Sequence, residues 1–144
     1  MTRRADSAVV MPTVRLLSPF VLTFALFTLF HGTSSVGGGF QGGVVAASVV
    51  VMFAFAFGMQ DTVAWLRSGV LLGLAVAAPI AFGVVALAGI TSGGAFLQFD
   101  RLPIPRASVY ATEAIELGIG ATVAAVVVIL FVTLAERPAE REQP

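Results

Sequence analysis

Long apolar runs, separated by short polar or glycine-rich segments, dominate this chain. Four runs stand out, at residues 13–30, 42–59, 68–90 and 108–134, and the last is continuously apolar over 117–134. About 20 helical residues cross the roughly 30 Å hydrocarbon core of a bilayer, and each run reaches that length within a few residues. Strands of a membrane β-barrel would alternate over about 10 residues, which these runs do not do. The pattern therefore predicts an all-α membrane protein with four transmembrane helices.

The composition leads to the same class of protein. Of the 144 residues, 58% are hydrophobic and only 11% are charged, and the mean hydropathy is +0.98. Soluble domains carry about a quarter charged residues, so this chain cannot cover a water-facing surface. We divide it into a cytoplasmic N-terminal segment (1–12), a four-helix transmembrane domain (13–135) and a polar cytoplasmic tail (136–144). The start is not interpreted as a secretory signal, because no small-residue cleavage site follows the first apolar run.

Several classes of function find no support in the composition. The chain has no cysteine and one histidine, which excludes disulfides, thiolate metal sites and a histidine-rich metal site. The formal net charge is zero, so nothing indicates nucleic acid as a partner. No nucleophile–base pair and no metal-ligating cluster is visible in the sequence. We therefore predict a protein that is not an enzyme and that holds neither a cofactor nor a metal.

Arginines near the ends of the apolar runs predict the orientation in the membrane. Basic residues gather on the cytoplasmic side of membrane helices. With the N-terminus in the cytoplasm, the inner side holds Arg3, Arg4, Arg15, Arg67, Arg137 and Arg141, and the outer side holds Arg101 and Arg106. This six-to-two ratio predicts that both termini are cytoplasmic. The inner segment 60–67 is short, so the second and third helices are expected to form a tight hairpin.

Small residues recur along two of the predicted helices and indicate close helix packing. They are Gly42, Ala46, Val50, Ala54 and Gly58 in the second helix, and Gly69, Gly73, Ala77 and Ala81 in the third. A spacing of four residues places them on one helix face, and small residues let membrane helices approach closely. The facing helices could belong to this chain or to another subunit. Pro79 lies in the middle of the third helix and is expected to kink it.

Two carboxylates near the start of the fourth helix are the first candidates for chemistry. Glu113 and Glu116 are three residues apart and share a helix face, which Gly120 continues. Ionisable residues at membrane depth are costly and commonly mark ion or proton pathways. The alternative is that both lie at the wet outer interface, where the N-terminal end of a helix favours anions. His31, at the end of the first helix, is a third candidate, and a simple interfacial role is its alternative.

A glycine-rich segment joins the first two helices on the outer side. It consists of Gly37, Gly38, Gly39, Phe40, Gln41, Gly42 and Gly43. It is not a phosphate-binding loop, because no Lys–Ser/Thr pair follows it and no strand precedes it. The segment could dip back into the protein, bring the start of the second helix close to another helix, or point free N–H groups at an ion path.

Two motifs together resemble a known family. The first runs from His31-Gly32 through the glycine-rich segment to Ala46-Ala47-Ser48, and the second is IELGIGATVAAVVVILF, which contains Glu116, Gly118 and Gly120. Both resemble the small B subunit of Mrp/Mnh-type multisubunit sodium/proton antiporters, and the resemblance covers about residues 13–135. One position departs from the pattern. The family commonly has proline where this chain has Val36, so the turn that enters the glycines is less rigid here.

The resemblance implies a four-helix subunit of a large membrane complex that exchanges Na⁺ for H⁺. In that family the proton channels belong mainly to the large subunits, and the B subunit is required for assembly. A second implied role is lining part of the sodium route. The expected partners are the other antiporter subunits and membrane lipid, with Na⁺ and H⁺ as the transported ions, in the cell membrane of a prokaryote.

Two other functions are open at this point. A homo-oligomeric channel or small transporter would need a complete ion path from this chain alone, for which only Glu113, Glu116 and His31 are available. A rotor-type proteolipid would carry one carboxylate at mid-membrane in a two-helix hairpin, whereas this chain has four predicted helices and an off-centre pair. A symmetric, ion-conducting oligomer of the purified chain would favour the channel.

Overall fold

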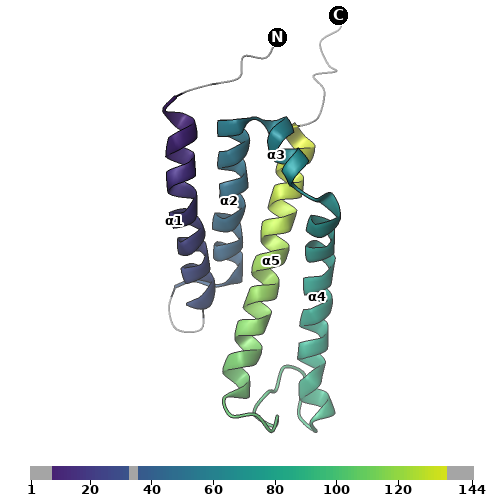
Figure 1. The fold of residues 1–144 in the computed structure, drawn as a ribbon. Coiled ribbons are helices and arrows are strands. Elements are labelled where there is room, and N and C mark those ends of the chain that lie inside the picture. The colour runs from purple at the N-terminus through teal and green to yellow at the C-terminus, as the bar shows by residue number, and fades with distance from the viewer. Residues whose placement is uncertain (1–7, 33–35, 136–144) are drawn as a thin grey trace, which may run out of the picture.

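The computed structural model of the chain describes residues 8–32 and 36–135, and every regular element in these residues is a helix (Figure 1). The helices are α1 (Val10–Phe30), α2 (Gly39–Phe57), α3 (Met59–Trp65), α4 (Ser68–Thr91) and α5 (Ala107–Ala135). Four of them, α1, α2, α4 and α5, are long and apolar enough to cross a membrane. The predicted all-α architecture with four long apolar helices is therefore confirmed. The predicted tail 136–144 and the first seven residues of the predicted segment 1–12 lie outside the described residues.

The four long helices form a row in the order α1, α2, α5, α4 (Figure 1). Each packs against its neighbour in this row, and α2 and α4 make no contact with each other. The predicted tight hairpin of the second and third membrane helices is therefore wrong. The two helices do not meet because the short helix α3 lies between them in the chain. It follows Gly58, which has a φ of +99°, and it separates the end of α2 from the start of α4. α5 then fills the space between them.

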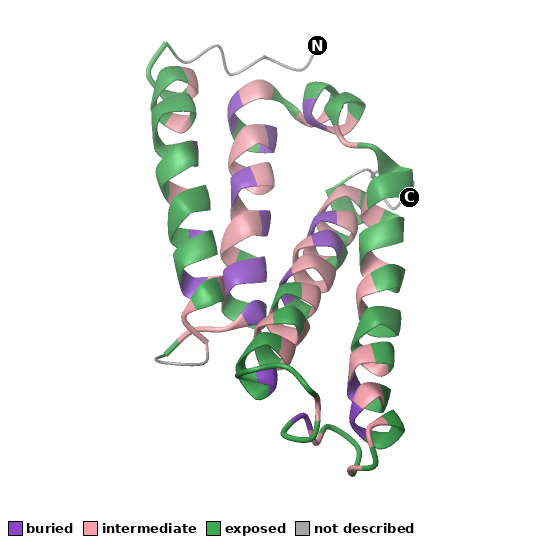
Figure 2. Ribbon diagram, turned by 60° about the horizontal axis from the view of Figure 1, so that its bottom comes forward, coloured by how far each residue is buried: buried purple, intermediate pink, exposed green. Residues whose placement is uncertain are grey.

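Nearly all buried residues of the helices are small, and α2 contributes more of them than any other described helix. Those of α2 are Gly39, Gly42, Gly43, Ala47, Val49, Ala54 and Ala56. In α4 only Ala86 and Gly89 are buried, and Figure 2 shows that α1 and α4 are mostly exposed. Lipid chains are as apolar as these side chains, so burial of large apolar groups does not drive membrane helices together. In this chain, close backbone packing at small residues holds the helices together instead.

Several hydroxyl side chains within the apolar helices are satisfied by their own helix. The hydroxyl of Ser18 donates to the carbonyl of Val14 at 2.5 Å, and that of Thr28 to the carbonyl of Phe24 at 2.8 Å. Thr112 donates in the same way within the first turns of α5. Such bonds matter in a bilayer, because an unpaired polar group in hydrocarbon has no water to bind.

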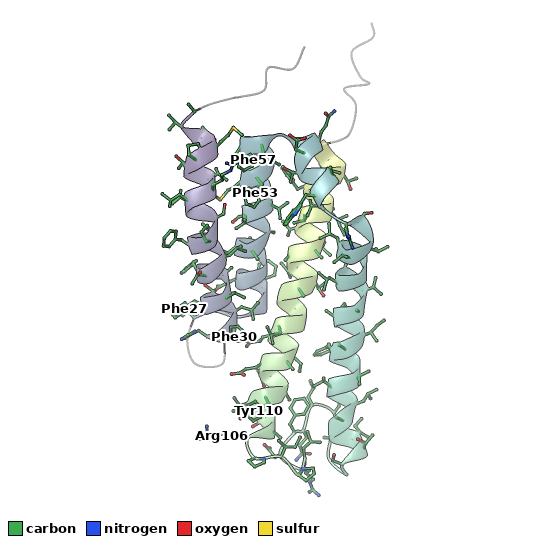
Figure 3. All side chains as sticks on the ribbon, in the orientation of Figure 1. Phe27, Phe30, Phe53, Phe57, Arg106 and Tyr110 are labelled. Atoms are coloured by element: carbon green, nitrogen blue, oxygen red, sulfur yellow. The ribbon has the colours of Figure 1, made fainter. Side chains whose placement is uncertain are left out.

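α4 is shifted along the bundle, so that its far end reaches beyond the ends of α1 and α2 (Figure 1). On α5, Gly118 faces Ala78 near the middle of α4, whereas Gly120 faces Gly39 at the very start of α2. Gly118 and Gly120 are only about 3 Å apart along the axis of α5. The middle of α4 is therefore level with the start of α2, and Tyr110, near the start of α5, lies beyond the end of α1 (Figure 3).

Candidate functional site

The segment between α1 and α2 turns back onto the last turn of α1. Gly38 has a φ of +124°, which glycine adopts without strain. Its N–H donates to the carbonyl of Thr28 at 3.0 Å, and its own carbonyl accepts the N–H of Gly42 at 3.0 Å. A Cβ placed on Gly37 would lie 2.5 Å from the same Thr28 oxygen. These two glycines therefore let α2 begin in direct contact with the end of α1.

Gly39 and Gly43 bring α2 and α5 together backbone to backbone. They belong to the first turns of α2, and both are buried. A Cβ on Gly39 would lie 2.9 Å from the N atom of Gly120, and a Cβ on Gly43 would lie 2.6 Å from the carbonyl oxygen of Gly120. Gly120 is buried as well. The four-residue spacing of the two glycines places both on the face that meets α5, as in small-residue contacts between other membrane helices.

Gly42 faces a different helix. A Cβ on this residue would lie 2.7 Å from the Cβ of Leu29 and 2.9 Å from the carbonyl oxygen of Ala25, both in α1. Leu29 also reaches α5, because its Cδ1 would lie 2.7 Å from a Cβ on Gly120. The glycine-rich segment is therefore the crossing point of α1, α2 and α5, and Leu29 fills the space between them.

Phe40 and Gln41 point away from this crossing. Both are exposed, and they line a groove of about 430 Å³ between α1 and α2, together with Phe24, Phe27 and Val36 among others. The motif thus has two faces, with its glycines toward the neighbouring helices and its phenylalanine and glutamine toward the surroundings.

The carboxylate of Glu116 reaches from α5 to the end of α1. A Cβ placed on Gly32 would lie 2.5 Å from the Cδ and Oε1 atoms of Glu116, and it would meet Oε2 as well. The backbone carbonyl of Glu116 lies against the position that a Cβ on Gly39 would take. The side chain is half-buried. It therefore lies where α1 ends and α2 begins, beside the end of α1 that exposes backbone carbonyls.

The other two predicted ion-pathway residues lie near this point. Glu113 is half-buried one turn before Glu116 on α5. His31 is the C-cap of α1, and its Nδ1 is 2.9 Å from the carbonyl oxygen of Phe27. A carbonyl only accepts, so Nδ1 carries the proton in this contact. The ring also stacks on Phe27 with centroids 3.9 Å apart, so its own helix fixes the orientation of His31.

Gly118 and Pro79 belong to a separate contact between α5 and α4. They line a cavity of about 260 Å³, together with Ala78, Phe82 and Thr122 among others. Among the described residues, the Oγ1 atom of Thr122 is buried without a hydrogen-bond partner. Pro79 lies inside the continuous helix α4, and the kink expected there stays a prediction.

The arrangement around Glu116 offers oxygen atoms to a cation. The carboxylate of Glu116 lies at the carbonyl end of α1, and both supply oxygen atoms. In transporters, the ends of broken helices and free backbone carbonyls commonly bind Na⁺ or H⁺. Within residues 8–32 and 36–135, no group of three or more His, Cys, Asp or Glu side chains could hold a metal ion.

Two residues of this site are not among the predicted site residues. Gly32 and Leu29 complete the crossing, but neither belongs to a repeated spacing. Gly32 appears only as part of the motif that begins at His31, and nothing in the sequence points to Leu29. Nothing in the sequence indicates that Gly32 faces a residue of the fourth membrane helix.

Comparison with known families adds a finding of its own. A family model described as a domain related to the MnhB subunit of Na⁺/H⁺ antiporter matches residues 9–133. The matched segment contains the glycine-rich crossing, both glutamates and nearly all of the four long helices. A search of curated proteins found no match.

Proposed function

Because this chain belongs to the family of domains related to the MnhB subunit of Na⁺/H⁺ antiporters, we infer that it is an integral membrane subunit of a multisubunit Na⁺/H⁺ antiporter. The four long apolar helices support a multi-pass membrane location. The membrane is the cell membrane of a prokaryote, and both termini face the cytoplasm. α1 begins and α5 ends at the same end of the row (Figure 1), as this orientation requires. The subunit catalyses no covalent reaction of its own.

The exposed face of α4 supports a role in assembly. Of the described helices, α4 contacts only α5. A Cβ placed on Gly69 or Gly73 would meet nothing within 4 Å. Glycines weaken an isolated helix and are useful in a membrane where another helix packs closely against them. We expect a helix of a neighbouring antiporter subunit to cover this face.

The position of Glu116 carries the proposal for ion movement. Its carboxylate contacts Gly32 at the carbonyl end of α1, and a negative group beside the negative end of a helix dipole attracts a cation. Glu116 therefore borders the sodium route of the complex. Glu113, one turn closer to the start of α5, lines the approach to it.

The shift of α4 determines how this route is reached. Gly118 follows Glu116 by two residues and faces Ala78 near the middle of α4. The carboxylate of Glu116 is therefore level with the outer end of α1 and with the middle of α4. A cation entering along the first turns of α5 therefore reaches Glu116 partway across the membrane.

Replacement of Glu116 in the assembled antiporter tests this function. Glu116→Gln keeps the size of the side chain and removes its charge, whereas Glu116→Asp keeps the charge and shortens the reach. We expect Glu116→Gln to lower Na⁺-dependent proton exchange about tenfold, equivalent to ~1.4 kcal/mol, and Glu116→Asp to lower it less. The measurement is antiport in everted membrane vesicles over a range of pH and Na⁺ concentrations.

The abundance of the complex is measured on the same membranes. Normal exchange at normal abundance in a Glu113→Gln/Glu116→Gln double variant would remove both carboxylates from the route. Loss of the complex in Glu116→Gln would show instead that Glu116 serves assembly. Failure of the chain to co-purify with other antiporter subunits would contradict the proposed function as a whole.

A further inference from the structure

The four long helices stand in a single row, which encloses no interior of its own. Among the described helices, α4 contacts α5 and touches neither α1 nor α2 (Figure 1). The carboxylate of Glu116 lies in this row at the crossing of α1, α2 and α5. A charge exposed to lipid is costly, so an ion that moves beyond Glu116 needs protein on its other side. Another polypeptide therefore has to supply that second wall.

Inward of Glu116, the membrane helices carry no ionisable side chain for most of their length. The stretches without one are residues 16–30, 39–57, 68–91 and 117–135. On α5 the stretch from Glu116 to Ala135 measures about 28 Å along the helix axis. A cation or a proton therefore finds no titratable group on α5 between Glu116 and the cytoplasmic end of that helix.

Leu29 closes the crossing on the inward side of Glu116. A Cβ on Gly42 would lie 2.7 Å from the Cβ of Leu29, and a Cβ on Gly120, one turn after Glu116, would lie 2.7 Å from the Cδ1 of Leu29. A Cβ on Gly39 would lie 2.9 Å from the N atom of Gly120. Helices packed at such separations leave no room for a cation to pass between α1, α2 and α5.

The cavity between α5 and α4 does not continue the route. The side chains that line its volume of about 260 Å³ are apolar, apart from the hydroxyl of Thr122. Moving a charge out of water into apolar surroundings costs many kcal/mol unless it is paired, and one hydroxyl does not replace a hydration shell. The inward half of the membrane is therefore closed to ions on both sides of α5.

We propose that this chain supplies only the outer half of the sodium route, and that the cation leaves Glu116 sideways, toward an acidic side chain on a helix of a different antiporter subunit. The inference rests on the function proposed for Glu116. A carboxylate suits the partner because it binds Na⁺ when ionised and H⁺ when protonated, which are the two ions that the antiporter exchanges. The cytoplasmic half of the route then belongs to the neighbouring subunit.

A second copy of this chain would not complete the route. It carries the same apolar stretches inward of Glu116, so pairing two copies adds no titratable group in the cytoplasmic half. The partner is therefore a different polypeptide, and its acidic side chain lies at the depth of Glu116, level with the middle of α4.

Single cysteines in the assembled antiporter test where the route ends. Val109 and Val127 share the helix face of Glu116, one on its outer side and one on its inner side. We expect Val109→Cys to react with a membrane-impermeant cationic thiol reagent added from outside, and Val127→Cys to react from neither side. Gln60→Cys, exposed just beyond the other end of α2, is the control and should react from the cytoplasmic side.

Labelling is measured on this chain after the subunits have been separated, and unfolding in detergent should make Val127→Cys fully reactive. Reaction of Val127→Cys from the cytoplasmic side, in a complex of normal abundance, would overturn the proposal, because the route would then continue along this chain. Failure of Val109→Cys to react from outside would overturn it as well, because the outer half would then lie elsewhere.

Photochemical cross-linking tests the partner. Leu117 and Ile119 are 40% and 42% exposed beside Glu116, and each is replaced in turn by benzoylphenylalanine in the assembled complex. We expect at least one of them to cross-link to a membrane helix of another antiporter subunit, within one turn of an Asp or Glu. Replacing that residue by its amide should lower Na⁺-dependent exchange about tenfold, as in Glu116→Gln.

Cross-links only to lipid, to a second copy of this chain, or to helices without an acidic residue would overturn the proposal. The outcomes also separate this inference from the function on which it rests. If Glu116→Gln impairs exchange and Val127→Cys reacts from the cytoplasmic side, the route passes Glu116 but continues through this chain, and only the inference is wrong. If Glu116→Gln leaves exchange normal, both are wrong.

Discussion

The carboxylate of Glu116 lies against the Cα of Gly32, one residue beyond the C-cap of α1. Any side chain at position 32 would take the space that this carboxylate occupies. Gly32 directly follows α1 and Glu116 belongs to α5, so a change at one residue acts directly on the other. Groups in such contact give substitution effects that do not add.

Gly32→Ala is expected to impair ion exchange through Glu116. The added methyl group would lie 2.5 Å from Cδ of Glu116, so the side chain must turn away from the end of α1. We expect Na⁺-dependent exchange to fall, but by less than the roughly tenfold loss in Glu116→Gln, because the charge remains. The measurement is antiport in everted vesicles with complex abundance determined in parallel.

Two comparisons make this prediction specific. Gly83→Ala is the matched control, because a Cβ there would meet nothing within 4 Å, and it should leave exchange unchanged. In a double variant, Gly32→Ala should add little to the loss caused by Glu116→Gln. Fully additive losses would show that position 32 acts on something other than this carboxylate.

Labelling of single cysteines tests the orientation. The chain has no cysteine of its own, and Val36 and Gln60 are exposed just beyond opposite ends of α2. The arginine distribution predicts that Val36→Cys reacts with a membrane-impermeant reagent in intact cells. Gln60→Cys should react only after the membrane is opened. The reverse pattern would place both termini outside the cytoplasm.

Thr122→Val is expected to raise the heat stability of the chain. The Oγ1 atom of Thr122 is buried without a partner among the described residues, and such a group costs about 1–3 kcal/mol. Valine fills the same space without a polar atom, so we expect a gain of about 1 kcal/mol. Thermal unfolding in detergent, followed by circular dichroism, measures it. A loss of stability would indicate that a water molecule in the cavity beside Pro79 satisfies this hydroxyl.

The sequence predicted the membrane helices because their length and apolar content are local properties. It did not predict how they are arranged, because neighbouring small residues contact different helices. Gly42 packs on α1 and Gly43 on α5, although they are adjacent in the chain. Likewise Gly118 faces α4 and Gly120 faces α2. A repeat of small residues shows that a helix packs closely, but it does not identify its neighbour.

The short helix α3 illustrates the same limit at the other end of the bundle. The segment 60–67 contains polar residues and a single tryptophan, which indicates an interface rather than a helix. Without α3, the shortest connection favours direct contact of the two helices that it joins. The seven residues of α3 remove that contact, and they also create a groove that Arg15 and Asp61 line.

Bulk at position 43 should separate α2 from α5. A Cβ on Gly43 would lie 2.6 Å from the carbonyl oxygen of Gly120 and 3.0 Å from the Cβ of Val123. Backbone atoms cannot move aside as a flexible side chain can. We expect Gly43→Ala to cost about 1–3 kcal/mol of stability, as overpacking does elsewhere, and Gly43→Leu to cost more and to lower the yield of assembled complex.

Val44→Leu is the matched control for this series, because it adds bulk at the next position of the same helix. Val44 is 39% exposed, so its larger replacement can point away from α5 and should leave stability and assembly unchanged. Unfolding in detergent and the amount of complex recovered from membranes are measured for each variant. A leucine at position 43 cannot be accommodated while the backbones of α2 and α5 keep their present separation. Normal stability and normal yield of complex in Gly43→Leu would therefore show that the close contact of α2 with α5 is not needed.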